Sequence, residues 1–218
     1  LLLFSVSPGE LEASGQLVMA GAAWEAAGDV RGQAGVMAAL LEDALYSADL
    51  RRAWLLAGEL EALGASDDLL AFWSGRMAWA SGLRSEACRT LSEVGAGDPW
   101  LLHRARGLAL LYGGDPEGAV QELALSVVSA DGARKALYAS LDLCCALISS
   151  GETDRALETA GLLCRRFPAE PLPVIMESLC LQLSGSGIAA LRRLSELPPG
   201  SPAGALLMAA RLEREFVD

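Results

Sequence analysis

Apolar and polar residues alternate along the chain with the period of an α-helix. Runs of about 11 to 18 residues carry apolar side chains at positions i, i+3, i+4 and i+7, and short breaks rich in Gly, Asp, Ser or Pro separate them. The breaks lie at Gly28-Asp29, Ser47–Asp49, Gly64–Ser66, Ser81-Gly82, Gly95–Gly97, Gly113–Asp115, Ala130–Gly132, Ser149–Gly151, Phe167-Pro168, Gly185–Gly187 and Pro198–Gly200. Between them the pattern predicts about twelve helices, the last near Ala203 to Phe216. Val and Ile are scarce, so strands have little to build on, and the sequence predicts an all-α fold.

Small residues recur at near-equal intervals, which indicates an internal repeat. Six alanines are separated by 33, 34, 32, 37 and 34 residues: Ala20, Ala53, Ala87, Ala119, Ala156 and Ala190. Five residues before them stand Gly15, Ala48, Gly82, Gly114, Gly151 and Gly185, and twelve residues after them Gly32, Ala65, Pro99, Asp131, Pro168 and Pro202. We expect the glycine to turn the chain between two antiparallel helices, the alanine to let the second helix approach the first, and the late proline to end it. Asp98-Pro99 and Asp115-Pro116 each predict an N-cap followed by a first-turn proline.

This regular spacing of glycine, alanine and proline, which we call the grid, resembles the tetratricopeptide repeat. The pattern of that repeat includes W-x₂-L-G-x₂-Y, A-x₃-F and a late proline. The best-matching segment is 140–168, which contains Leu143, Cys144, Leu147, Gly151, Ala156 and Pro168. The resemblance covers residues 8–216 and implies one domain, an α-solenoid of about six antiparallel helix pairs in a right-handed superhelix. Half-a-tetratricopeptide arrays and other related helical repeats are alternatives. Residues 1–7 would be an N-terminal extension or an artificial chain boundary.

Charge and cysteine usage narrow the range of partners and compartments. The net charge is −11 and no basic face is visible, which argues against nucleic-acid binding. No apolar stretch is long enough for a membrane-spanning helix. The five cysteines are odd in number and show no CxxC spacing, so we expect free thiols and a cytoplasmic protein. The opening Leu1–Phe4 leaves an exported or membrane-tethered protein as the alternative.

Residues that could carry chemistry stand alone rather than in constellations. The candidates are His103, Cys144-Cys145, Glu42-Asp43, Asp67-Asp68 and Gly185–Gly187. A metal needs several ligands and a general base needs an oriented nucleophile, and no segment supplies either set. We interpret the histidine and cysteines as ordinary helix residues, the acid pairs as residues of turns or solvated helix faces, and the glycines as a turn. The sequence therefore predicts a non-enzyme without a metal or other cofactor.

The resemblance implies that the first helix of each pair lines a concave groove. The family's peptide-carboxylate clamp uses Lys and Asn there, but this chain has one Lys and no Asn. The groove-facing stripe is instead mostly apolar, with Arg76 and Arg104 among it, and the predicted partner-binding residues are Phe72, Trp79, Leu108, Tyr112, Tyr138, Leu141, Ile175 and Leu179. If the helical phase is wrong, the same residues are core. The sequence favours a scaffold that binds a protein or a basic, amphipathic peptide, and the alternative is a self-associating homo-oligomeric module.

Overall fold

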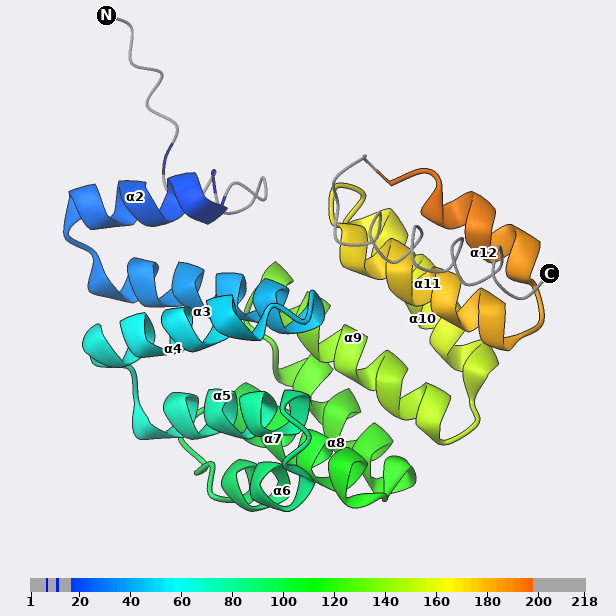
Figure 1. The fold of residues 1–218 in the computed structure, drawn as a ribbon, viewed down its shortest axis with the longest axis horizontal. Coiled ribbons are helices and arrows are strands. Elements are labelled where there is room, and N and C mark those ends of the chain that lie inside the picture. The colour runs from blue at the N-terminus through cyan, green and yellow to red at the C-terminus, as the bar shows by residue number, and fades with distance from the viewer. Residues whose placement is uncertain (1–6, 8–10, 12–16, 198–218) are drawn as a thin grey trace, which may run out of the picture. The chain divides into compact units, whose positions relative to one another are not determined.

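The computed structural model describes residues 7, 11 and 17–197, and within these residues it contains helices and no strand (Figure 1). The helices are α2 (Leu17–Ala27), α3 (Val30–Tyr46), α4 (Leu50–Ala62), α5 (Asp67–Ala80), α6 (Arg84–Ser92), α7 (Pro99–Gly113), α8 (Pro116–Ser129), α9 (Ala133–Ser149), α10 (Thr153–Arg166), α11 (Pro171–Leu183) and α12 (Gly187–Leu194). This confirms the predicted all-α fold. The described residues do not include the helix expected near Ala203 to Phe216. They also do not include Gly15 and Pro202. No helix among the described residues combines the length and the apolar character that crossing a membrane requires.

Aspartate caps begin several of the helices. The side chain of Asp98 accepts a hydrogen bond from the Trp100 amide at 3.0 Å, and that of Asp115 accepts one from Gly118 at 2.9 Å. Proline follows each of these two aspartates at the first helical position, where its missing N–H has no intrahelical acceptor to lose. Both predicted helix starts are therefore confirmed.

The predicted turns between paired helices adopt the left-handed conformation. Positive φ angles occur at Gly82, Gly114, Gly151 and Gly185, and also at Ala48, where φ is 57°. Ala48 stands at the place in the grid that these four other repeats fill with glycine. A Cβ disfavours this conformation, so Ala48 holds a strained backbone that glycine would relieve.

The six repeat alanines all lie on the second helix of a pair and are buried. Five are fully buried and Ala190 is 3% exposed. Close approach between the paired helices is clearest in α5 and α6, where a Cβ added to Gly75 would lie 2.6 Å from Cγ of Leu91. The small residues therefore do what the grid predicts, which is to let one helix of a pair settle against the other.

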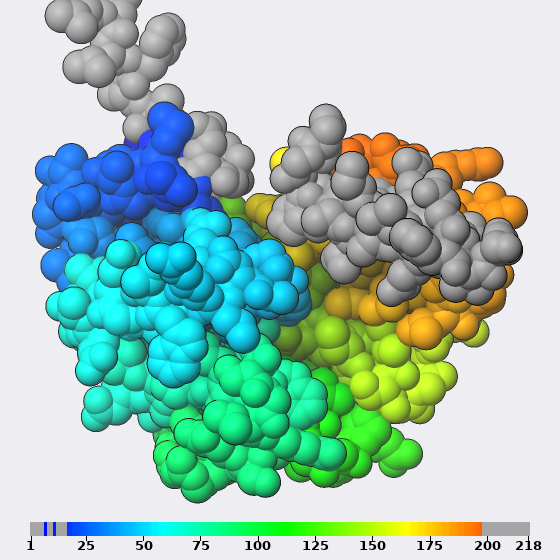
Figure 2. All heavy atoms as spheres, viewed as in Figure 1, coloured from blue at the N-terminus to red at the C-terminus, as the bar shows by residue number. Residues whose placement is uncertain are grey.

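The helices form two compact units, residues 1–114 and residues 115–218. In unit 1 each helix from α2 to α7 packs on the next, and α5 also contacts α3 and α7. In unit 2 the same holds from α8 to α12, and α9 also contacts α11. First helices of neighbouring pairs thus lie side by side within a unit, while a second helix such as α4, cyan in Figure 2, presents an outer face to solvent.

Candidate partner-binding surface

The eight predicted partner-binding residues divide equally between the two units and differ in burial. Phe72 and Trp79 lie on α5, Leu108 and Tyr112 on α7, Tyr138 and Leu141 on α9, and Ile175 and Leu179 on α11. Five are buried: Phe72, Leu108, Tyr112, Tyr138 and Leu141. Trp79 is 40% exposed, Leu179 is 45% exposed, and Ile175 is half-buried. As placed, the five buried side chains pack within the fold and only the other three offer area to a partner.

A buried ionic cluster joins the first helices of unit 1. Glu42 on α3 accepts hydrogen bonds from Arg76 on α5 and Arg104 on α7, one guanidinium to each carboxylate oxygen. Glu42 is 2% exposed and Arg104 is fully buried. The expectation that Glu42 lies at a turn or on a solvated face is therefore wrong. The carboxylate is held inside because two arginines from neighbouring repeats satisfy both of its oxygens.

Aromatic rings surround this cluster. The Arg104 guanidinium lies 5.0 Å from the ring centre of Phe72 and 5.3 Å from that of Trp100. The Arg76 guanidinium lies 5.2 Å from the ring of Tyr46. Ring faces attract cations and add to the carboxylate in offsetting the desolvation of the two arginines. The cluster is therefore a structural joint between three first helices. Phe72 is one of the aromatic residues that pack around it.

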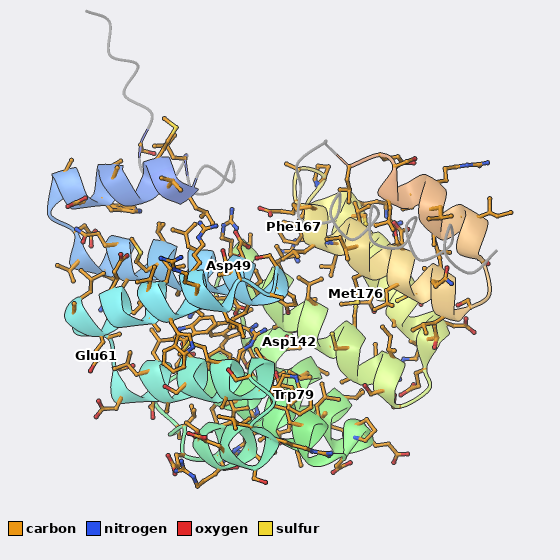
Figure 3. All side chains as sticks on the ribbon, in the orientation of Figure 1. Asp49, Glu61, Trp79, Asp142, Phe167 and Met176 are labelled. Atoms are coloured by element: carbon orange, nitrogen blue, oxygen red, sulfur yellow. The ribbon has the colours of Figure 1, made fainter. Side chains whose placement is uncertain are left out.

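Trp79, near the C-terminal end of α5, is the exposed residue among the four predicted partner-binding residues of unit 1 (Figure 3). Its ring stacks on that of Tyr112 of α7, with centroids 3.9 Å apart and an angle of 1° between the planes. The Arg84 Nε donates to the backbone carbonyl of Tyr112. Leu83, which follows α5, is also exposed. Tyr112 thus acts as a buried backing that fixes the orientation of the more exposed Trp79.

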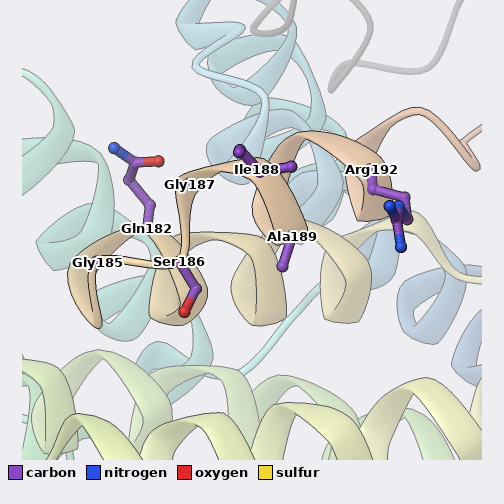
Figure 4. A pocket seen from close by; sticks show the side chains of 7 residues that line it. All are labelled: Gln182, Gly185, Ser186, Gly187, Ile188, Ala189 and Arg192. Carbon is purple, nitrogen blue, oxygen red and sulfur yellow. The ribbon is translucent and has the colours of Figure 1, made fainter.

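On the first helices of unit 2, the large exposed apolar residues lie along α11. Ile175, Leu179 and Leu183 are spaced by four residues and lie on one side of this helix. A depression of about 620 Å³ lies beyond the helix end, at the turn into α12 (Figure 4). Its lining comprises Gln182, Gly185, Ser186, Gly187, Ile188, Ala189 and Arg192. The lining holds no acid and no cysteine, so it offers contact area and a few polar groups rather than a catalytic set.

The cysteines are free, as predicted. Burial raises the pKa of the Cys164 thiol to about 11, and it also raises the pKa of Cys144 and of Cys180. The Cys164 thiol donates to Glu177 at 3.3 Å, and the Arg193 Nε donates to the same carboxylate oxygen at 2.6 Å. These thiols stay protonated near neutral pH, so they are poor nucleophiles. Among the described residues, no group of three or more His, Cys, Asp or Glu side chains is placed to hold a metal ion.

Together, the glycine turns, the buried second-helix alanines and the stacked first helices give the chain a helical-repeat fold of the tetratricopeptide-like kind that the sequence predicts. No protein-family profile matches the chain, and no curated protein matches it. Among solved structures it is similar to MamA of AMB-1 in two crystal forms, at 16% identity in each. These have TM-scores of 0.43 and 0.42, with 78% and 85% of this chain and 96% and 98% of those chains covered. It is also similar to pilF of Pseudomonas aeruginosa, at 16% identity and a TM-score of 0.44, with 93% of this chain and 99% of that chain covered. At this level of similarity these structures say nothing about what this chain binds.

Proposed function

We propose that the chain is a non-catalytic scaffold that binds a protein or an amphipathic helical segment through the exposed apolar residues of its first helices. The observation that carries the proposal is the half-exposed Trp79, which stacks on the buried Tyr112, with the exposed Leu83 four residues further along the chain. A large ring held in one orientation loses little conformational freedom on binding, which is the property of an interface anchor. Leu179 and Ile175 are the corresponding residues of unit 2.

The partner's charge follows from that of the scaffold. The chain carries a net charge of −11, so a basic partner is attracted at long range and like-charged proteins are repelled. The apolar side of the partner would cover Trp79 and Leu83, while the basic side of the partner remains in water. We therefore propose a basic, amphipathic partner, and binding that weakens as the salt concentration rises.

The test uses peptides selected from a random library displayed on phage against the immobilised full chain. We expect the selected peptides to be basic and amphipathic. Trp79→Ala should weaken their binding by about 2 kcal/mol, or about 30-fold in Kd, because the anchor is lost. Trp79→Phe, which keeps an aromatic ring on Tyr112, should retain most of the affinity. Isothermal titration calorimetry measures each Kd, and circular dichroism checks that each variant is folded.

Two controls make the result specific. Trp54→Ala removes an exposed tryptophan from the outer face of α4, away from the first-helix surface, and should leave the Kd unchanged. Leu179→Ala tests unit 2 in the same way as Trp79→Ala tests unit 1. Selected peptides that bind Trp79→Ala and Leu179→Ala as tightly as the unsubstituted chain would overturn the proposal.

A further inference from the structure

The outer face of helix α4 departs from the pattern of the other second helices. The residue two places after the repeat alanine is small in α2, where it is Ala22, and polar in α6, α8, α10 and α12, where it is Arg89, Gln121, Glu158 and Arg192. In α4 it is Leu55, which is 63% exposed, and the residue before it is Trp54, which is 61% exposed. A tryptophan and a leucine side by side in solvent are costly to leave uncovered. The repeat does not require the leucine, since the other repeats place polar or small residues at the position of Leu55. The position of Trp54 is apolar in four of the other repeats, where it is Cys88, Val120, Leu157 and Leu191.

The charges of α4 are also arranged against the stability of the isolated helix. Arg51 and Arg52 lie in its first turn, and Glu59 and Glu61 lie in its last turn. A helix N-terminus is electropositive and a C-terminus electronegative, so these four side chains carry the sign of charge that the helix dipole disfavours, and only the capping carboxylate of Asp49 has the favoured sign. All four side chains are exposed, and the described residues supply none of them with an ion pair. Packing among the residues that the structure describes therefore gives no reason for this charge order.

We propose that α4 is a self-association surface, which packs antiparallel against α4 of a second copy of the chain about a twofold axis at Leu55. Arg51 and Glu59 are each four residues from Leu55, so Arg51 of one copy lies level with Glu59 of the partner subunit. The antiparallel arrangement pairs the basic end of each helix with the acidic end of the other. It also orients the two helix dipoles in opposite directions. The charge order that is unfavourable in one helix becomes complementary in two.

The shape of the face fits the same arrangement. Residues 51, 55, 58 and 62 follow one another on one side of the helix at spacings of three and four. Position 58 is glycine, and nothing lies within 4 Å of where its Cβ would stand. A second helix can therefore approach closely at this point, with the Trp54 ring of the partner subunit beside Gly58 and Leu55 against Leu55. The two ends of α4 are marked in Figure 3 by Asp49, its N-cap, and Glu61.

A second copy suits this face better than an unrelated partner because the face is complementary to itself. A twofold interface uses the same patch twice and needs each basic residue to meet an acidic one related by the axis, which the order Arg51, Leu55, Glu59 provides. One helix face with two large apolar side chains is smaller than the area of about 800 Å² per partner in stable interfaces, so the dimer should be weak and concentration-dependent. The α4 face is separate from the first-helix surface, so this inference does not depend on the proposed function.

The experiment is sedimentation equilibrium of the full chain over a range of concentrations from micromolar to near-millimolar. We expect the mean mass to rise with concentration toward that of a dimer. Leu55→Glu places like charges at the twofold axis and should raise the dimer Kd by at least about tenfold. Leu162→Glu changes an exposed leucine on α10 and is the matched control, which should leave the Kd unchanged. Circular dichroism checks folding, which these exposed positions should not disturb.

Charge reversal tests the antiparallel arrangement. Arg51→Glu alone should weaken the dimer, because the introduced carboxylate of one copy and Glu59 of the partner subunit would then repel each other. The double variant Arg51→Glu with Glu59→Arg restores the pairing in reverse and should bring the Kd back toward that of the unsubstituted chain. The proposal is overturned if the chain is monomeric at every concentration, if Leu55→Glu leaves the dimer intact, or if the double variant is no tighter than Arg51→Glu.

Discussion

Removing the buried carboxylate at the centre of unit 1 should be among the most destabilising single changes in the chain. Glu42 receives one hydrogen bond from each of two arginines, and the three side chains are almost completely removed from water. Glu42→Gln keeps the shape of the side chain and takes away its charge. Two guanidinium groups then keep their positive charges in the interior without the anion that faced both of them.

The size of the effect follows from the burial of the cluster. Hydrogen bonds that involve charged groups contribute about 1.5–3 kcal/mol each, and breaking a buried ion pair costs about 3–5 kcal/mol. We expect Glu42→Gln to lower the free energy of unfolding of unit 1 by about 3–5 kcal/mol. With a urea m-value of about 1–3 kcal/mol/M, the midpoint should fall by at least about 1 M.

Tryptophan fluorescence is a suitable assay because it reports on unit 1 alone. All five tryptophans of the chain lie before residue 115, and Trp73 and Trp100 lie close to the cluster. The control is Glu93→Gln, which breaks the exposed Arg89–Glu93 pair and should cost no more than about 0.5 kcal/mol. If Glu42→Gln changed the unfolding free energy by less than about 1 kcal/mol, the assignment of Glu42 as the joint of three helices would be refuted.

A triple variant separates the cost of breaking the cluster from its net contribution. Glu42→Leu with Arg76→Leu and Arg104→Met replaces all three charges by apolar side chains. Such replacements are often neutral or stabilising, because no desolvated charge remains. We expect the triple variant to be more stable than Glu42→Gln. A triple variant less stable than the single one would show that the cluster contributes more by its charges than by filling space.

Four further predictions concern the repeat and the thiols. Ala156→Leu should destabilise unit 2 by about 1–3 kcal/mol through overpacking, measured by circular dichroism during urea unfolding. Ala48→Gly should raise the free energy of unfolding by up to about 1 kcal/mol, because glycine tolerates the φ of 57°, and a loss of stability would show that this turn is not strained. Burial raises the pKa of Cys164 above the ordinary value of 9.0, so unfolded thiols ionise first as the pH rises and unit 2 should lose stability above about pH 9. Alkylation of Cys144, Cys164 and Cys180 near pH 8 should accordingly be slow until urea unfolds the chain, and rapid labelling of all five thiols in the folded protein would contradict this.

The second helices could be predicted well from the sequence because each buries one face and exposes the other. Close packing between paired helices requires the repeat alanines, and the left-handed turn before each second helix favours glycine. Each of these requirements places a fixed residue type at a fixed interval in the sequence. The ionic cluster leaves a weaker signal, since Glu42 pairs with residues 34 and 62 positions away. A sign was nevertheless present: Glu42 and Arg76 are one repeat length apart, and each stands inside an apolar run on a first helix.

The phase of the first helices could not be fixed from their own sequences because these helices pack on several neighbours. α9 contacts α8, α10 and α11, and ten of its 17 residues are buried. Such a helix has apolar residues around most of its circumference, so several stripes at the same spacing are equally consistent with its sequence. The stripe through Tyr138 and Leu141 lies on a buried side of α9. Only the burial of each residue in the structure, and not the spacing in the sequence, distinguishes this stripe from an exposed stripe.

Comparison between repeats is more informative for an exposed surface than the periodicity of a single helix. Packing determines the residue types on one face of a second helix, and the outer face contacts solvent. Comparison with the other repeats shows which residue types occur on that outer face. At the position of Leu55 they are polar or small. The departure at Leu55 therefore has to be explained by something outside the repeat. The reversed charge order of Arg51 and Glu59 on the same helix is a second departure, and a single antiparallel contact between two copies of α4 accounts for both.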